Sequence, residues 1–289
     1  MTTPVNQSQH KVPQVYLKKF GYKDLNNQWK VSVLKRGNER PMQKSIKSFT
    51  AEVNHFDIES DDPRIHRMFE KMNATLEGEY NNIVKEVESD GELSEKSIAY
   101  LLQFVAVQIV RSDKWRAQIM EFLEPDTRRN FLQFIIGHRA KDAQEFKDMP
   151  NQPFFQSLMD LPSDKLINRA LLFFSEYLIM RIGHFEVVIL ETTDERPWYT
   201  STDPVIVDNR IDKDNLEIFA KESEVYFPLT PKHLLYLHFK GSDDQVNSLR
   251  SLSSERIHLV EQAQAWEIQK KISANAHEFL VLAGEHREE

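Results

Sequence analysis

The sequence predicts an α+β protein with a central helical bundle, an N-terminal β-ribbon and a C-terminal antiparallel β-meander. Residues 28–34 alternate apolar and polar side chains, which is a strand pattern. Apolar residues then recur at helical spacing between residues 64 and 182, and strand-like runs return after residue 184. Because strands and helices are segregated along the chain, the class is α+β and not alternating α/β.

Composition places the chain among soluble globular proteins. The 289 residues are 40% hydrophobic and 28% charged, and none is cysteine, which excludes disulfides, thiolate nucleophiles and cysteine-ligated metals. The apolar runs 101–110 and 171–180 are too short and too interrupted to span a membrane. We therefore expect a cytoplasmic protein with no membrane partner.

A single domain over residues 1–289 is expected, because neither a linker nor a repeat interrupts the pattern. It divides into three parts, a basic β-rich N-terminal module, a helical core, and a β-meander with a terminal helix and strand, at residues 1–60, 64–183 and 184–289.

The helical core begins after Asp62-Pro63, and its first helix covers residues 64–88. Ser94 is a suitable N-cap for a second helix that continues to about Leu123. Because this helix is apolar on nearly all sides through residues 101–110, it is expected to be central and buried. A further buried helix is predicted at residues 164–182, ending at Gly183.

The C-terminal part is predicted to contain short strands, because brief apolar runs alternate there with turn residues. These strands are expected at residues 185–190, 198–199, 205–207, 216–219, 225–227 and 234–239. Residues 244–275 are predicted to form a helix and residues 277–282 a final strand.

Charge is distributed unevenly along the chain. Ten basic and two acidic residues give residues 1–48 a net charge of +8, although the whole chain carries −8. Such a basic segment can bind a nucleotide or nucleic acid, or it can pack against the acidic remainder of the same chain. The oligomeric state is not readable from these residues.

The segment from His10 to Phe20 contains the first candidate site residues. In an extended chain His10, Gln14 and Tyr16 would share one face, whereas a helix starting near Pro13 is equally allowed. His10 is of interest because an imidazole can relay protons or bind a metal near neutral pH. A structural histidine is the alternative.

Gln108 and Arg111 are the second candidate pair. Their spacing places both side chains on one face of the predicted buried helix. An amide and a guanidinium in such apolar surroundings need hydrogen-bond partners. The partner of Arg111 can be a substrate phosphate or carboxylate, or an internal acid that holds helices together.

The third candidate is the turn at residues 199–205, which contains Ser201 and Asp203. Loops after strands often present functional groups, and the following proline keeps Asp203 extended. Its carboxylate could contact Arg111 or His10, bind a metal, act as a base, or belong to an ordinary Asp-Pro turn.

In order along the chain, these stretches resemble the DUF4238 family, a group of microbial proteins of unknown function. The family's His-x-Val-Pro-x-x-Tyr-Leu-x-x-Phe, Gln-x-x-Arg and Pro-Leu-(Ser/Thr)-Pro motifs are matched at residues 10–20, 108–111 and 228–231. A Thr-Ser-Asp-x-Pro-like turn is matched loosely at residues 200–204, where Thr202 separates the serine from the aspartate. The resemblance spans about residues 10–283 and implies a shared fold and shared polar positions, without an activity.

The residues favour one function and leave a second open as the alternative. In the first, the chain is a hydrolase or transferase acting on a phosphate-containing substrate, for example a nuclease, with His10 as acid or base, Arg111 stabilising negative charge and Asp203 orienting the histidine. Gln14, Tyr16, Gln108 and Ser201 would then bind substrate. The cofactor is unknown, although Asp203 could bind a divalent metal. Neighbouring genes of a defence or toxin system would strengthen this interpretation.

In the second function, the chain is a non-enzymatic interaction or regulatory protein. The histidine, glutamine, arginine and aspartate then form a buried network that fixes the junction between helices and sheet.

Overall fold

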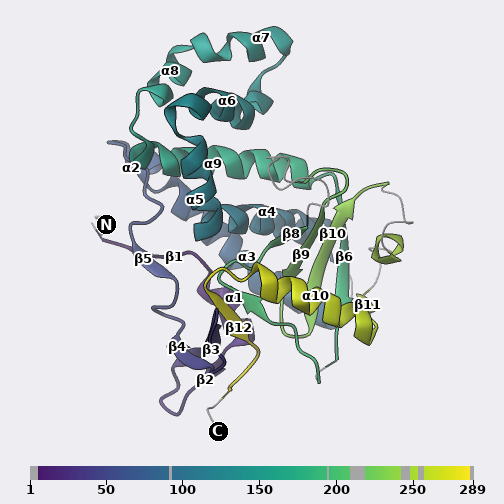
Figure 1. The fold of residues 1–289 in the computed structure, drawn as a ribbon. Helices are drawn as coiled ribbons and strands as arrows, with labels where there is room; N and C mark the ends of the chain where they lie inside the picture. The colour runs from purple at the N-terminus through teal and green to yellow at the C-terminus, as the bar shows by residue number, and fades with distance from the viewer. Residues whose placement is uncertain are drawn as a thin grey trace.

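In a computed structural model the chain adopts the expected α+β fold (Figure 1). The structure describes residues 6–90, 93–193, 195–208, 219–241, 248–252 and 257–286. The helices of the core lie on one side of the molecule, and the C-terminal sheet, with a long helix in front of it, lies on the other (Figure 1).

The N-terminal part combines a short helix with strands. Strand β1 (Ser8–His10) pairs antiparallel with β5 (Ala51–Val53), and helix α1 (Gln14–Phe20) starts directly after Pro13. The remaining strands of this part are β2 (Tyr22–Lys23), β3 (Trp29–Lys35) and β4 (Met42–Ser45). β3 confirms the strand predicted from alternation, and both conformations considered for the opening motif occur, one after the other.

The helical core contains most of the helices. In chain order these are α2 (Pro63–His66), α3 (Met68–Asp90), α4 (Glu95–Arg111), α5 (Asp113–Phe122), α6 (Pro125–Ile136), α7 (Ala143–Asp148), α8 (Pro153–Met159) and α9 (Ser163–Ile182). The Ser94 hydroxyl accepts a hydrogen bond from the Ser97 amide at 3.2 Å, so the predicted N-cap of α4 is confirmed.

The prediction of one helix from Ser94 to Leu123 is wrong at Ser112. This residue is extended, with φ −79° and ψ 146°, and separates α4 from α5. Its hydroxyl accepts a hydrogen bond from the Trp115 amide at 3.4 Å, as an N-cap does. The break therefore has a local cap that the apolar periodicity on either side concealed.

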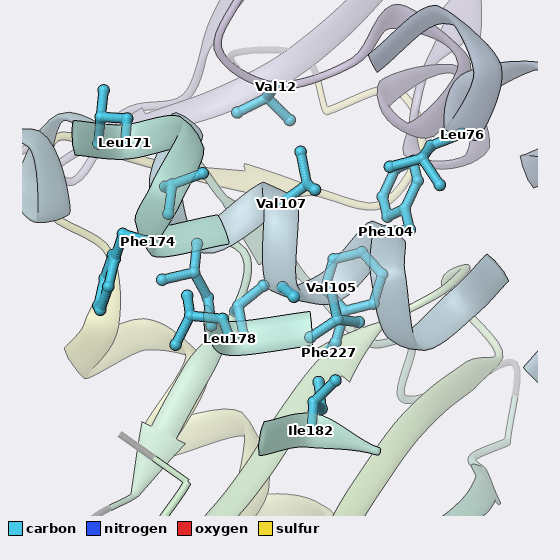
Figure 2. Packing of buried hydrophobic residues seen from close by; sticks show 14 of the residues in the cluster. Val12, Leu76, Phe104, Val105, Val107, Leu171, Phe174, Leu178, Ile182 and Phe227 are labelled. Carbon is cyan, nitrogen blue, oxygen red and sulfur yellow. The ribbon is translucent and has the colours of Figure 1, made fainter. Parts of the chain in front are cut away.

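α4 and α9 form the centre of the hydrophobic core (Figure 2). Figure 2 shows Val105 and Val107 of α4 in the middle of the cluster, with Phe174 and Leu178 of α9 on one side and Phe104, next to Leu76, on the other. Val105, Phe174 and Leu178 are fully buried. The prediction of a central helix that is apolar on nearly all sides is thus confirmed for the middle of α4.

The C-terminal sheet has the strand order β11-β6-β10-β9-β8. Its strands are β6 (Phe185–Glu191), β8 (Ile206–Asp208), β9 (Glu224–Pro228), β10 (His233–Phe239) and β11 (Ile257–Leu259). Neighbouring strands are antiparallel except β11, which runs parallel to β6.

Three predictions in this region need comment. The helix predicted at 244–275 is wrong for the described residues before Gln262: these form a 3-10 helix η3 (Ser248–Ser251) and then β11, and α10 (Gln262–Asn275) is the α-helix of the part that the structure describes. The strand predicted at 198–199 falls instead on β7 (Thr200–Ser201). The strand predicted at 216–219 lies, except for Phe219, outside the described residues.

A second sheet joins the two ends of the chain. β12 (Phe279–Leu282) pairs antiparallel with β3 on one side and with β7 on the other. The order is therefore β2-β3-β12-β7, with β4 also paired to β3. The basic N-terminal segment shares this sheet with C-terminal strands.

Within the described ranges, none of the helices has both the length and the apolar character needed to cross a membrane.

Candidate functional site

The candidate residues of α4 bind the main chain of the opening motif. Gln108 Nε2 donates to the carbonyl oxygen of Lys11 at 3.0 Å, and one terminal nitrogen of Arg111 donates to the carbonyl oxygen of His10. The other terminal nitrogen donates to Glu77 Oε1 at 2.9 Å. We call this set the carbonyl network: Gln108, Arg111, Glu77 and the carbonyl groups of His10 and Lys11.

Both α4 side chains are enclosed by the protein. Gln108 is 1% exposed and Arg111 is 4% exposed. The guanidinium carbon lies 5.9 Å from the centre of the Phe56 ring, within range of a cation–π contact. Both terminal nitrogens of Arg111 therefore donate hydrogen bonds within the protein, one to a backbone carbonyl and one to a carboxylate of helix α3.

Two polar atoms of these side chains have no hydrogen-bond partner among the described residues. They are Arg111 Nε and Gln108 Oε1. A buried polar atom left unpaired costs about 1–3 kcal/mol. Large cavities in the described part of the chain, of about 670, 630 and 530 Å³, are lined by other residues, so these atoms do not face them.

The imidazole of His10 points to groups other than Arg111. Its Nε2 lies 3.0 Å from the Lys47 carbonyl oxygen and 3.2 Å from Gln14 Nε2. Among the hydrogen bonds and ion pairs between described residues, none joins this imidazole to the Arg111 guanidinium or to the Asp203 carboxylate. His10 and Arg111 therefore meet only through the backbone carbonyl of His10.

Lys11 attaches the same segment to the start of α5. Its Nζ lies 2.7 Å from Asp113 Oδ2 and also pairs with Glu52. Burial lowers the pKa of Lys11, but the hydrogen bonds to Asp113 and Glu52 outweigh burial and leave the pKa raised. The ammonium group and the carbonyl of one residue thus bind α5 and α4 respectively.

Thr50, which the sequence did not single out, holds the other side of the opening motif. Its φ of 61° lies in the left-handed region, which is unfavourable for a β-branched residue. Its hydroxyl lies 3.3 Å from both the amide nitrogen and the carbonyl oxygen of Val12, and its carbonyl accepts from the Lys11 amide at 2.9 Å. These bonds stabilise the strained backbone and fix the turn into α1.

Tyr16 is fully buried and serves packing. Its hydroxyl hydrogen-bonds the Thr200 hydroxyl of β7, and its ring stacks on Phe227 with centroids 5.1 Å apart. Burial raises the pKa of the Tyr16 phenol far above its usual range. A phenol that stays protonated at all ordinary pH values is poorly suited to act as a base.

Asp203 lies at another junction. Its Oδ2 accepts from the His277 amide at 3.3 Å, its amide donates to Ser201 Oγ at 3.1 Å, and its carboxylate hydrogen-bonds Ser112 at the break between α4 and α5. Burial raises the pKa of Asp203, and the hydrogen bonds from His277 and Ser112 only partly oppose this rise. The carboxylate therefore links β7, the α4–α5 break and the connection from α10 to β12.

The structure thus distributes the candidate residues over two neighbouring groups. His10, Gln14, Gln108 and Arg111 gather where β1 meets α4, whereas Tyr16, Ser201 and Asp203 lie around β7. The groups adjoin, because Ser112 beside Asp203 directly follows Arg111 in the chain.

Comparison with known protein families places these motifs in context. The model of a family described as "Protein of unknown function (DUF4238)" matches residues 8–279. The chain belongs to the DUF4238 family. Neither a curated protein nor a solved structure matches it.

Over the described part of this DUF4238 chain, no group of three or more His, Asp or Glu side chains is arranged to hold a metal ion. Where Asp203 lies, the surrounding groups are the Ser112 hydroxyl, the His277 amide and the Lys114 ammonium. These groups favour the charged form of Asp203 but only partly oppose the effect of burial.

A second polar cluster of the DUF4238 chain escaped the sequence analysis. Glu224 of β9 is fully buried; its Oε1 accepts from Arg250 Nε at 3.1 Å and from the Tyr236 hydroxyl at 3.2 Å, and its Oε2 from the Tyr226 hydroxyl at 2.8 Å. Burial and the adjacent carboxylate raise the pKa of both phenols. Lys271 of α10 completes the cluster, 3.2 Å from the Tyr226 hydroxyl.

Part of this cluster had a sequence signal. Glu224 and Tyr226 are two residues apart in a strand and so share a face, and Tyr236 pairs directly with Tyr226 across β9 and β10. Arg250 and Lys271 had none, because they come from η3 and α10, which the apolar pattern merged into one helix.

Proposed function

We propose that this DUF4238 chain is a non-enzymatic interaction or regulatory protein, and that its histidine, glutamine, arginine and aspartate motif residues form a structural network. The observation that carries the proposal is the carbonyl network itself. Arg111 is 4% exposed and directs both terminal nitrogens at protein acceptors. A guanidinium that stabilises a reacting phosphate must instead direct donors at the substrate.

The other motif residues support the same proposal. The Asp203 carboxylate is engaged by the His277 amide and the Ser112 hydroxyl, and the Tyr16 phenol by Thr200. Each side chain fixes one segment to another, which is how buried polar networks specify a unique packing. The competing hypothesis, a hydrolase or transferase acting on phosphate, requires these groups to turn towards a common substrate.

The test compares the wild-type protein with His10→Ala in screens for phosphomonoester and phosphodiester hydrolysis, with and without divalent metals. Lys85→Ala serves as the control, because Lys85 is an exposed residue of α3 and lies outside the basic segment 1–48. We expect no turnover that depends on His10. Hydrolysis by the wild type that disappears in His10→Ala at an unchanged melting temperature would favour the phosphate enzyme instead.

A second candidate function, polyanion binding, is favoured by the basic N-terminal residues. Several of them are exposed and form no ion pair with any acid in the described ranges: Lys18, Lys23, Lys35, Arg36, Arg40 and Lys47. Exposed cations without an acidic partner form a local positive surface that can bind phosphates, although the whole protein carries a net charge of −8.

Titration of a fluorescent oligonucleotide at several salt concentrations tests this candidate. Binding to the basic surface should weaken steeply with salt and weaken further in a Lys35→Glu, Arg36→Glu variant. Salt-independent binding, or equal affinity of the variant, would contradict it.

A further inference from the structure

The N-terminal half of α10 borders a cavity that the motif residues do not reach. The cavity has a volume of about 670 Å³, within the range of small-ligand sites. One wall is the segment leading into β7, with Arg196, Trp198 and Tyr199, and the other is α10, with Trp266 and Gln269. α10 itself lies across the C-terminal sheet (Figure 1).

Two buried hydrogen-bond donors, one from each wall of the cavity, have no partner among the described residues. Trp198 is 1% exposed, and its indole Nε1 has no hydrogen-bond partner among the described residues. Gln269 Oε1 accepts from the Tyr199 amide at 3.2 Å, which fixes the orientation of the side-chain amide and leaves Nε2 as a donor. Nε2 is likewise buried and has no hydrogen-bond partner among the described residues.

The rim of the cavity supplies an aromatic surface and a positive charge. Trp266 is 60% exposed although it is one of the largest apolar side chains. Lys270 Nζ lies 3.0 Å from the centre of its ring, so a cation covers one face of the indole. The exposed guanidinium of Arg196 lies on the opposite wall.

We infer that this cavity binds a planar heteroaromatic ring rich in hydrogen-bond acceptors, of the nucleobase type. The ring stacks on Trp266, and its acceptor atoms take the hydrogen bonds offered by the Trp198 indole and the Gln269 amide. Arg196 provides for a phosphate when the ring is part of a nucleotide. This inference goes beyond the proposed function and stands independently of it, because none of the motif residues lines the cavity.

Isothermal titration calorimetry of the full chain with purine and pyrimidine nucleosides and their 5′-monophosphates tests the inference. At least one of these compounds should bind. Trp266→Ala and Gln269→Leu should each weaken binding by roughly tenfold or more, the loss expected from one base–aromatic stack or one donor. Phe154→Ala, at another exposed aromatic residue, in α8, should leave affinity unchanged.

Arg196→Ala distinguishes whether the ligand is a nucleoside or a nucleotide. If nucleotides are the ligands, this variant should lower monophosphate affinity to the level of the nucleoside; if nucleosides are the ligands, the two affinities already agree in the wild type. No binding of any of these compounds in the millimolar range would overturn the inference. So would binding that survives both Trp266→Ala and Gln269→Leu, or tighter binding of a simple sugar glycoside.

Discussion

Replacing Arg111 by methionine tests the carbonyl network most quantitatively. Methionine keeps the apolar stem of the side chain but removes the guanidinium. The His10 carbonyl then loses a charged hydrogen-bond donor, worth about 1.5–3 kcal/mol. Glu77 loses its ion-pair partner, and because its side chain is 30% exposed this pair is worth at most about 1 kcal/mol.

The contact with Phe56 contributes about 0.5–1 kcal/mol more. The variant should therefore be destabilised by about 2–5 kcal/mol, which lowers the melting temperature by on the order of 10 °C. Urea unfolding followed by circular dichroism measures the change, and Arg129→Met, at an exposed position of α6, is the matched control. An Arg111→Met variant as stable as the control would refute the reasoning.

Three further outcomes are expected. Burial raises the pKa of Asp203, so the wild type should lose stability as pH rises from the unfolded pKa near 4 through the folded pKa. Asp203→Asn should be as stable as the wild type or more so at pH 7. In urea titrations the free energy of unfolding of this variant should depend less on pH across that window. A clear loss of stability at pH 7 would reverse this sign. Glu224→Gln leaves the nearly buried Arg250 without its counter-charge and should cost about 3–5 kcal/mol by thermal unfolding, whereas a cost below about 1 kcal/mol would show that the pair is solvated. Gly21→Ala would place a Cβ 2.5 Å from the Lys30 carbonyl oxygen and should cost about 1–3 kcal/mol, and a neutral result would mean that this backbone contact yields easily.

The sequence predicted correctly those parts of the fold that depend on interactions between residues close together in the chain. The alternation at 28–34 and the Ser94 N-cap are properties of neighbouring residues, and both features are present in the structure. The break at Ser112 was missed because the apolar periodicity on either side hides its local N-cap; its contact with Asp203 depends on a residue far along the chain. The pairing of β12 with β3 depends in the same way on residues at opposite ends of the sequence.

The candidate site was predictable only in part. The spacing of Gln108 and Arg111 indicated that both side chains serve one place, and both reach the adjacent carbonyls of His10 and Lys11. The acceptors themselves carried no signal, since every residue has a backbone carbonyl. A search for a side-chain partner of Arg111 therefore pointed to Asp203, whereas Glu77 of α3 is the acid that it contacts.

Hydrogen exchange on the opening motif tests the structural role of Arg111 most directly. Backbone amides of residues 8–20 should exchange markedly faster in Arg111→Met than in the wild type under conditions where both are folded, because the guanidinium no longer holds the His10 carbonyl against α4. The helices far from this contact, such as α8, should exchange at the same rate in both proteins. Unchanged protection of residues 8–20 in the folded variant would contradict the claim that Arg111 acts by holding this segment in place.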